Sequence, residues 1–282
     1  MAQGSARDPD LVVELLWRDG DAKRVLSLER IVQAAVEVAD GEGLSGLSMR
    51  KVAERLGFTG MSLYRHVPGR DALVELMCDA VLGGPPEDPV GGGWRSRLEE
   101  WARKGWELRK RHPWLAEVRG TRQLPGPNGV AHYEHVLGIL AGTGLAPAEV
   151  VAAVNLVGRF VDAEAAVLVE AARAERSSGV GHDEWWAARG SLYAWLDRYP
   201  TLTALWEAGG FDESEDPFEF GLARVLDGIE LLVGKRDEMR DEMRDGMCQE
   251  CGEPVERQSS GRTRAYCSRA CQQRAYRKRK SG

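Results

Sequence analysis

The 282-residue sequence predicts an all-α protein: a helix-turn-helix domain, a larger helical domain and a small cysteine-rich module at the C-terminal end. Three observations carry this prediction. Apolar residues recur at helical spacing between Leu28 and Val233, and no run there alternates with the period of two typical of strands. A tight turn containing glycine separates two short helical patterns near residue 60. Four of the five cysteines fall within the last 35 residues.

Breaks in these patterns predict the domain boundaries. Glycine and proline residues interrupt the helical pattern between Gly83 and Gly93, and a charged repeat of Asp-Glu-Met-Arg precedes the cysteines. The repeat is typical of a solvated helical spacer. We therefore predict an N-terminal arm at 1–26, a helix-turn-helix domain at 27–84, a larger helical domain at 94–234, a charged linker at 235–247, and a cysteine-rich module with a basic helix at 248–282.

Composition limits the compartment and the partners. No apolar run approaches the roughly 18 residues that a membrane span needs, and the polar first ten residues do not resemble a signal peptide. Clustered cysteines argue against a disulfide framework, so we expect a reduced, cytoplasmic protein without a membrane partner. The net charge is −6, yet residues 257–282 contain nine Lys or Arg and no Asp or Glu. The C-terminal end is thus a strongly basic segment on an acidic protein.

The first predicted helix starts after Ser27, a favourable N-cap, and its apolar residues from Ile31 to Ala39 share one face. We expect Gly41 and Gly43 to end it. A second helix follows with Ser48 as its N-cap and stops near Gly57.

A four-residue turn, Gly57 to Gly60, then leads into a very short helix from Met61 to His66, which Pro68-Gly69 stops. Two helices joined by a tight turn containing glycine are the signature of a helix-turn-helix motif. Such a motif places the start of its second helix in the major groove and aims helix N-termini at phosphates. The predicted partner of this segment is double-stranded DNA.

The segment from Leu28 to Leu82 resembles the TetR family of repressors, most closely from Leu47 to Leu73 with its Leu-Tyr-Arg-His-Val sequence. The resemblance implies that Arg50 reaches bases or phosphate, that Gly60, Met61 and Ser62 face bases, that Tyr64 and His66 contact phosphate, and that Arg70 anchors the next helix to the DNA backbone. Gly60 has no side chain, so base readout must depend on Arg50, Met61, Ser62 and Arg65. The predicted DNA-binding residues are Lys23, Arg24, Ser48, Arg50, Thr59, Gly60, Met61, Ser62, Tyr64, Arg65, His66 and Arg70.

Several of these residues have a simpler interpretation. The Tyr64 ring could cap the small core, His66 could be a packed structural histidine, and Arg50 could be merely solvated. Lys23 and Arg24 could reach the adjacent minor groove as an arm, or form a disordered basic pair.

Three long helices are predicted in the middle domain, at 96–110, 147–173 and 219–233. The helix at 147–173 is apolar on more than one side, which is typical of burial on both faces. In the TetR family two late helices pair with their symmetry mates, and the helices at 147–173 and 218–233 resemble that pair. The resemblance implies a homodimer on a palindromic operator, and a repressor whose effector favours a dimer that no longer matches adjacent grooves.

Eight of the nine tryptophans fall in this domain, which suggests an aromatic-lined cavity for an apolar or aromatic effector. The alternative is that the rings fill a helical core. No arrangement typical of chelating a drug-bound Mg²⁺ is evident. The predicted ligand-binding residues are Trp101, His112, Trp114, Arg159 and Asp162.

The C-terminal cysteines have the spacing of a zinc site: Cys248-x2-Cys251, fifteen residues, then Cys267-x3-Cys271. Four thiolates fill a tetrahedral site and leave no position for water, so the predicted cofactor is structural Zn²⁺. A knuckle, a hairpin (255–258 with 262–266) and a helix (268–280) together resemble a treble-clef finger. Redox-active or disulfide-bonded cysteines are the alternative.

The last helix alternates basic residues with Tyr276, a pattern that suits phosphate contact. DNA backbone outside the core operator is the favoured target, with RNA, a partner protein or a solvated tail as alternatives. No catalytic constellation appears, so an enzyme is not expected. The favoured function is a DNA-binding transcriptional regulator released by a small-molecule effector; the alternative is a zinc-finger adaptor for nucleic acid or protein without effector control.

Overall fold

The computed structural model describes residues 9–17, 26–85, 87, 91–118, 124–196, 198–211, 216–245, 247–248, 250–255 and 266–280. These ranges contain helices and an isolated bridge between Met247 and Pro254, which confirms the all-α prediction. The elements are α1 (Pro9–Leu16), α2 (Leu28–Gly46), α3 (Met49–Leu56), α4 (Gly60–Leu63), α5 (Arg70–Leu82), α6 (Trp94–Arg111), η1 (Pro113–Glu117), α7 (Pro127–Ala141), α8 (Pro147–Ser178), α9 (His182–Ala187), α10 (Gly190–Leu196), α11 (Pro200–Glu207), α12 (Pro217–Asp245) and α13 (Arg269–Lys280).

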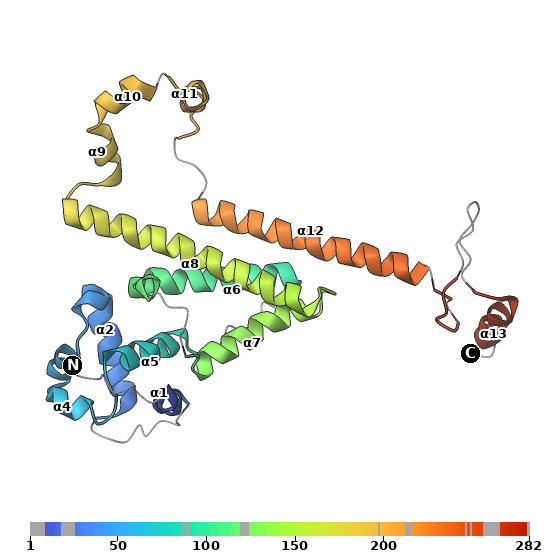
Figure 1. Ribbon diagram of the computed structural model, residues 1–282, viewed down its shortest axis with the longest axis horizontal. Helices are drawn as coiled ribbons and strands as arrows, with labels where there is room; N and C mark the ends of the chain where they lie inside the picture. Colours follow the sequence, from blue (N-terminus) through green and yellow to red (C-terminus); the bar gives the residue numbers. More distant parts are fainter. Residues whose placement is uncertain are drawn as a thin grey trace, which may run out of the picture.

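Helices α2 to α5 pack around the first of two hydrophobic cores (Figure 1). Its most buried side chains include Ile31, Val52, Leu63 and Leu73, each with no exposed surface. The predicted N-cap of α2 is confirmed, since the Ser27 side chain accepts a hydrogen bond from the backbone N–H of Arg30 at 3.4 Å.

The end of α2 differs from the prediction. Helical hydrogen bonding continues through Gly41 to Gly46, and only Gly43 leaves the helical region, with φ of 70°. Glycine adopts this conformation without the steric cost of a Cβ, so Gly43 kinks the helix rather than ending it. The extra turn brings Leu44 into the core.

The structure also differs from the predicted N-terminal arm. Residues Pro9–Leu16 form a helix, and its Val12 and Leu16, one turn apart, are buried against the first core. The indole N–H of Trp17 donates to the carbonyl of Pro125 at 3.3 Å. Lys23 and Arg24, the proposed minor-groove arm, lie outside the described residues.

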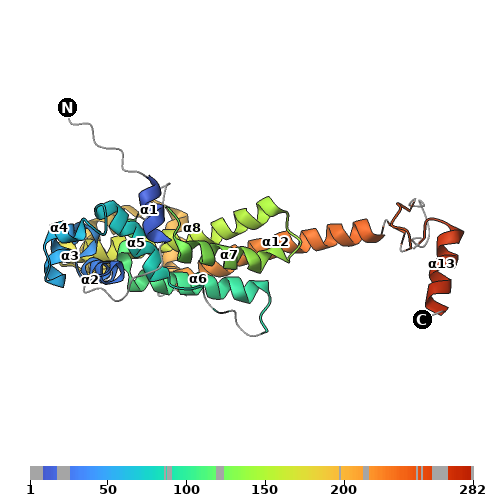
Figure 2. The ribbon, with the colours of Figure 1, turned by 90° about the horizontal axis from the view of Figure 1, so that it is seen from below.

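Helices α6, α7, α8 and α12 enclose the second core, beside the first domain (Figures 1 and 2). Phe218 at the start of α12 stacks on Trp106 of α6, with ring centroids 4.7 Å apart and an interplanar angle of 7°. Phe160 of α8 also stacks on Phe218, with ring centroids 5.6 Å apart. Aromatic rings therefore fill this part of the core, which was the alternative to a cavity lined with tryptophans.

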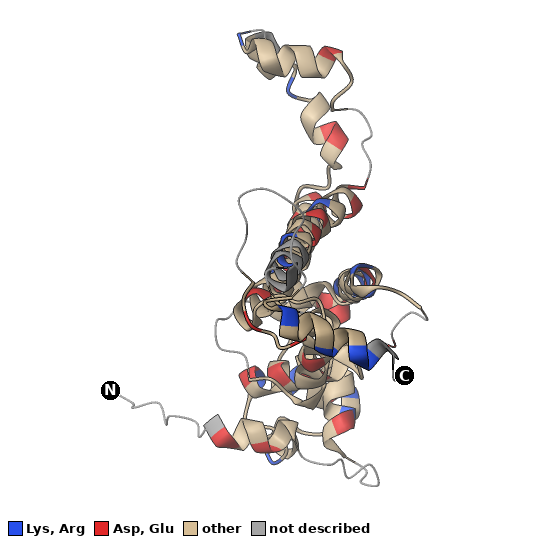
Figure 3. Ribbon diagram, turned by 90° about the vertical axis from the view of Figure 1, so that its right-hand side faces the viewer, with Lys and Arg blue, Asp and Glu red and all other residues tan. Residues whose placement is uncertain are grey.

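Helices α9, α10 and α11 form an arm that stands away from the body between α8 and α12 (Figures 1 and 3). Four of the tryptophans assigned to a cavity or a core lie here and are exposed instead, at 41% to 56% of their surface: Trp185, Trp186, Trp195 and Trp206.

Helix α12 runs without interruption from the second core into the charged repeat and ends at Asp245. The predicted spacer is therefore helical and continuous with the last core helix. Within the described residues, no helix is long and apolar enough to cross a membrane.

Candidate nucleic-acid interface, effector cavity and metal site

The turn between α3 and α4 depends on Gly57. This residue has φ of 75° and ψ of 26°, the left-handed region, and its N–H donates to the carbonyls of Ala53 and Glu54. Glycine enters this region without strain, so it ends α3 and redirects the chain within a few residues. The helix-turn-helix geometry expected from the sequence is present.

Helix α4 separates its residues into a buried and an exposed set. Leu63 and the following Val67 have no exposed surface, whereas Met61 is 74% and Tyr64 51% exposed. The two hydroxyl oxygens of Thr59 and Ser62 lie 3.0 Å apart at the start of the helix. A protruding apolar side chain beside hydroxyl groups is suited to contact with base edges and methyl groups in a major groove.

The start of α3 presents Ser48 and Arg50. The Ser48 hydroxyl accepts the backbone N–H of Lys51 at 3.2 Å, so its role as N-cap is confirmed. The Arg50 side chain is 87% exposed and donates to Glu54 one turn later at 2.7 Å. This hydrogen bond raises the pKa of the Arg50 guanidinium, and DNA phosphate would compete with Glu54 for it.

Arg70, which the family resemblance assigns to the DNA backbone, is exposed and also bonded within the domain. Its guanidinium donates to the carbonyls of Leu44 at 2.6 Å and Leu47 at 3.1 Å, between the end of α2 and the start of α3. The side chain thus joins α5 to the carbonyl-rich end of α2. The DNA contact of Arg70 stays a prediction, beside this internal role.

The remaining predicted DNA-binding residues lie on α4 or directly after it. Gly60 is half-buried and no atom lies within 4 Å of where a Cβ would be, Arg65 is exposed, and His66 is half-buried. Two ion pairs connect α3 to α2: Lys51 pairs with Glu42, and Arg55 pairs with Glu37 at 2.7 Å. The sequence analysis did not single out either cation.

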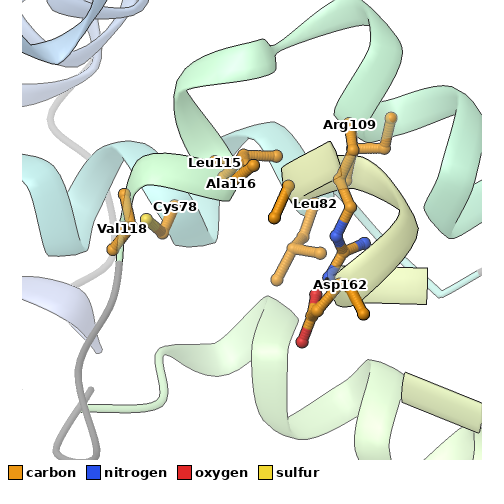
Figure 4. A pocket seen from close by; sticks show the side chains of 10 residues that line it. Cys78, Leu82, Arg109, Leu115, Ala116, Val118 and Asp162 are labelled. Atoms are coloured by element: carbon orange, nitrogen blue, oxygen red, sulfur yellow. Dashed lines mark hydrogen bonds and ion pairs between the residues drawn. The ribbon is translucent and has the colours of Figure 1, made fainter. Parts of the chain in front are cut away.

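Three adjoining cavities surround Leu82, the last residue of α5. They measure about 550, 460 and 440 Å³, and Leu82 lines all three. The largest lies between α5 of the first domain and η1, α6 and α8 of the second (Figure 4). Its position means that a molecule bound there touches both domains, and its size suits a small organic ligand.

The 550 Å³ cavity is mostly apolar with one charged edge. Cys78, Leu115 and Val118 line one side of it, and an ion pair between Arg109 and Asp162 forms the opposite edge (Figure 4). Arg109 also donates to the carbonyl of Gly105 at 3.0 Å, which fixes its orientation on α6.

Glu75, which the sequence analysis did not single out, lines the 440 Å³ cavity beside Cys78. Its Oε2 atom is buried and has no hydrogen-bond partner among the described residues. Burial, with a smaller contribution from Asp71, raises the pKa of this carboxyl, and burial raises the pKa of the Cys78 thiol to about 12. A thiol so placed is a small hydrophobic group, whereas Glu75 is an acceptor available to a ligand.

Helix α5 is fastened to α7 next to these cavities. The Asp79 side chain is buried and accepts the backbone N–H groups of Asn128 at 3.4 Å and Gly129 at 2.8 Å, at the start of α7. A Cβ at Gly126 would lie 2.3 Å from the Asp79 carboxyl carbon, so only glycine permits this approach. His132 Nε2 lies 3.2 Å from the carbonyl oxygen of Leu82.

The five predicted ligand-binding residues divide into two groups. Trp101 and Asp162 line the 460 and 550 Å³ cavities respectively. His112 lines a further cavity of about 590 Å³ between α1, α2, α5 and α7. Its Nδ1 atom and the Trp114 indole N–H meet the same Asp40 oxygen, at 2.8 and 2.7 Å, and Trp114 is buried in the first core. Arg159 is exposed on α8 and lines none of the three cavities.

The four C-terminal cysteines converge. Their sulfur atoms all lie within 4.8 Å of one another, with Cys251 and Cys267 at 3.4 Å and Cys267 and Cys271 at 3.6 Å. Zinc–sulfur bonds of about 2.3 Å place tetrahedral sulfurs about 3.8 Å apart, so the donor set fits a zinc ion.

The local backbone supports this arrangement. Gly252 has φ of 74° and donates to the carbonyl of Cys248 at 2.9 Å, which forms the expected knuckle. Arg274 donates to the Cys271 sulfur at 2.9 Å, and hydrogen bonding from Ser268, with a lesser contribution from Arg274, lowers the pKa of that thiol. Most of the predicted hairpin, including residues 256–265, lies outside the described residues.

Two family models match the chain. One, described as "Tetracyclin repressor-like, C-terminal domain", covers residues 85–233, and the other, "Bacterial regulatory proteins, tetR family", covers residues 31–77. The cysteine module lies beyond both matches.

Individual relatives agree. The HTH-type transcriptional repressor DrrR1 of Streptomyces coeruleorubidus is 41% identical over 235 residues, covering 79% of this chain and 86% of the relative. A tetracycline repressor of class A from Escherichia coli is 30% identical, with 71% and 88% covered.

Among solved structures, apo ActR from Streptomyces coelicolor superimposes with a TM-score of 0.60 at 29% identity, covering 75% of this chain and 98% of ActR. ActR in complex with actinorhodin gives a TM-score of 0.60 at 30% identity, with 74% and 96% covered. The chain therefore belongs to the TetR family, and it is a DNA-binding transcriptional regulator of the effector-responsive kind and not an enzyme.

Proposed function

We propose that the protein is a homodimeric repressor of a palindromic operator, released when an apolar or aromatic effector enters the cavities around Leu82. The observation that carries this proposal is the position of those cavities between the helix-turn-helix domain (α2 to α5) and the second domain. A ligand in that position binds more tightly to one arrangement of the two domains than to another. This difference in affinity is what shifts the population between the two arrangements.

The surfaces of α8 and α12 support the dimer. These helices pack on each other, and α8 buries one face that includes Val154, Val157 and Val161. Apolar residues of both helices remain exposed in the single chain: Val151, Leu156, Val167 and Leu168 of α8, and Phe220 and Leu231 of α12. A second copy would cover this apolar surface, in keeping with the TetR resemblance and with the expected burial of α8 on both faces.

The cavity chemistry supports an aromatic or apolar effector with a hydrogen-bond donor. Leucine, valine and aromatic side chains line most of the surface, and the buried Oε2 of Glu75 needs a donor. The comparison structures include ActR bound to actinorhodin and to (S)-DNPA, so effectors of drug size fit this fold.

The contacts of α5 support transmission from cavity to DNA. Leu82 at one end lines the cavities, and Arg70 at the other end holds the start of α3 through the carbonyl of Leu47. A displacement of α5 therefore moves the helix-turn-helix relative to the dimer axis. Adjacent half-sites lie about 34–36 Å apart, so a shift of a few ångströms weakens simultaneous binding.

Selection of genomic DNA fragments by the purified protein tests this function. We expect an inverted repeat, bound by a dimer with affinity that falls with salt, and release by a cavity-binding aromatic compound in the same assay. Arg65→Ala on α4 should weaken binding, whereas Arg173→Ala, exposed on α8, is a matched control that should not. A monomer without preference among DNA sequences would contradict the proposal.

We further propose that the four cysteines bind one structural Zn²⁺ per chain. The sulfur distances and the absence of any position for water in a four-thiolate site support this. Zinc would hold α13 to the knuckle of Cys248 and Cys251. Metal analysis of protein purified without added metal should give one zinc per chain, and Cys267→Ser should abolish it; the free thiols reacting fully in the presence of bound zinc would argue against ligation.

A further inference from the structure

Helix α13 is the most basic element of the chain. It contains six Lys or Arg among twelve residues and no Asp or Glu, on a protein whose net charge is −6. Tyr276 and Lys278 are 60% and 74% exposed, and Arg277 is exposed beside them. Exposed cations flanking an aromatic ring suit the phosphates and sugar faces of nucleic acid.

The cations of α13 are not all equivalent. Arg274 donates to the Cys271 sulfur, and Lys278 pairs with Glu250 at 2.8 Å, so both serve the fold of the module. Arg269 and Arg277 are exposed at the start and in the last turn of the helix.

The path of α12 carries α13 away from the helix-turn-helix domain. The first domain meets α8 near Asp162 and Ala166, where the 550 Å³ cavity lies. Helix α12 leaves the body at the other end of α8, where Arg236 pairs with Glu149. The two places are about 20 Å apart along α8 at 1.5 Å per residue, and α12 continues for nine more residues in the outward direction.

Figures 1 and 2 show the result: α13 lies at one end of the molecule and α4 at the other, in both views. The sequence analysis favoured contact with DNA flanking the operator. The separation instead places α13 away from the duplex that α3 and α4 of the same chain would hold.

We propose that the C-terminal module is a second DNA-binding end, whose helix α13 binds the phosphates of a separate duplex, so that one dimer bridges two DNA segments. Duplex DNA is favoured because the protein, once on its operator, is surrounded by it at high local concentration. Contact with about three phosphates per module gives weak, sequence-independent and salt-sensitive binding, which two modules in a dimer strengthen. The effector plays no part in this proposal.

A two-duplex capture assay tests it with the full-length, zinc-loaded protein. A short operator duplex of about 30 base pairs, just longer than two half-sites, is immobilised and saturated with protein. A labelled duplex without operator is then added, and its retention is measured at increasing salt. We expect retention that falls steeply with salt.

Two double variants isolate α13. Arg269→Glu with Arg277→Glu should reduce retention of the second duplex at least about tenfold, while affinity for the short operator stays unchanged. Arg269→Lys with Arg277→Lys keeps the positive charge, so this double variant should still retain the second duplex. Zinc content of both variants shows whether the module is folded.

Four results would overturn the proposal. The first is that the native protein retains no second duplex, and the second is that the charge-reversed protein with zinc bound retains as much of it as the native protein does. The third is that RNA of equal length displaces the second duplex at far lower concentration. The fourth is that a longer operator duplex binds the protein more tightly and abolishes retention of the second duplex, which would mean that α13 contacts the DNA that flanks the operator. Because operator affinity is measured separately, failure of bridging is distinguishable from failure of the repressor function.

Discussion

The carboxylate of Asp79 accepts the backbone N–H of Gly129 at 2.8 Å, and this bond fastens α5 to the first turn of α7. A negative charge at a helix N-terminus interacts favourably with the unpaired N–H groups there. The Asn128 side chain returns a bond to the Asp79 carbonyl at 3.0 Å. Helix α5, which connects the cavity to the helix-turn-helix, is thus held by a buried polar contact with specific geometry.

Asp79→Ala should lower the free energy of unfolding by about 1–3 kcal/mol, because it leaves N–H groups of α7 unpaired in a buried place. It should also weaken effector-induced release, since α7 lines two of the cavities. Urea denaturation and operator release measure the two effects. Glu170→Ala, exposed on α8, is the control; equal stability of both variants would contradict the role of Asp79.

Arg70→Met distinguishes an internal bond from a DNA contact. If the bonds to Leu44 and Leu47 are its function, the variant loses about 1.5–3 kcal/mol of stability, the range for hydrogen bonds to charged groups. The dependence of operator affinity on salt should stay unchanged. A phosphate contact would instead lower the slope of log affinity against log salt by about one per chain, with little loss of stability. Anisotropy titrations at several salt concentrations decide between them.

Glu75→Gln should change how stability depends on pH. The pKa of Glu75 is raised above its ordinary value of 4.5, so the folded state holds this proton more firmly than the unfolded state. Its contribution is therefore fully present below pH 4.5 and is lost as pH rises through the raised pKa. Relative to the native protein, the variant should therefore gain stability as pH rises from 4 to 7, because Gln has no proton to lose.

Urea denaturation at each pH measures this difference. Glu170→Gln, in an exposed position, should show no such trend. If the stability gained by Glu75→Gln were instead largest at pH 4, burial could not be the cause of the raised pKa, because burial predicts the opposite trend.

Removal of metal should unfold the C-terminal module and leave the rest of the chain intact. A strong chelator would release the ion and with it α13, because a module of this size has little core of its own. Far-ultraviolet circular dichroism should lose a small helical fraction, while the main thermal transition stays in place. Loss of the main transition would show that the module supports the second core.

The local structure of the helix-turn-helix domain could be predicted because it depends on residues that are close together in the sequence. Ser27 and Ser48 cap their helices as expected, and Gly57 turns the chain where only glycine does so without strain. Four cysteines at zinc spacing likewise converge. In each case residues within about twenty positions determine the outcome.

Relationships between distant segments could not be predicted in this way. The partners of Trp114 and Arg70, which are Asp40 and the carbonyls of Leu44 and Leu47, become visible only when α2, α5 and η1 are packed together. The same holds for Glu75, since an unpaired acceptor is recognised only once its surroundings are known. The helix at Pro9–Leu16 was missed because its two buried residues are a weak periodic signal within a polar segment.

The unbroken course of α12 makes it a lever. About 18 Å of helix separate Val233, its last residue in the second core, from Asp245. A rigid rod of that length converts a tilt of about 10° at the core into a sweep of about 3 Å at its tip. A small change in the packing of the second core therefore becomes a larger displacement at the end of α12, so the direction in which the C-terminal module points depends on how α8 and α12 pack.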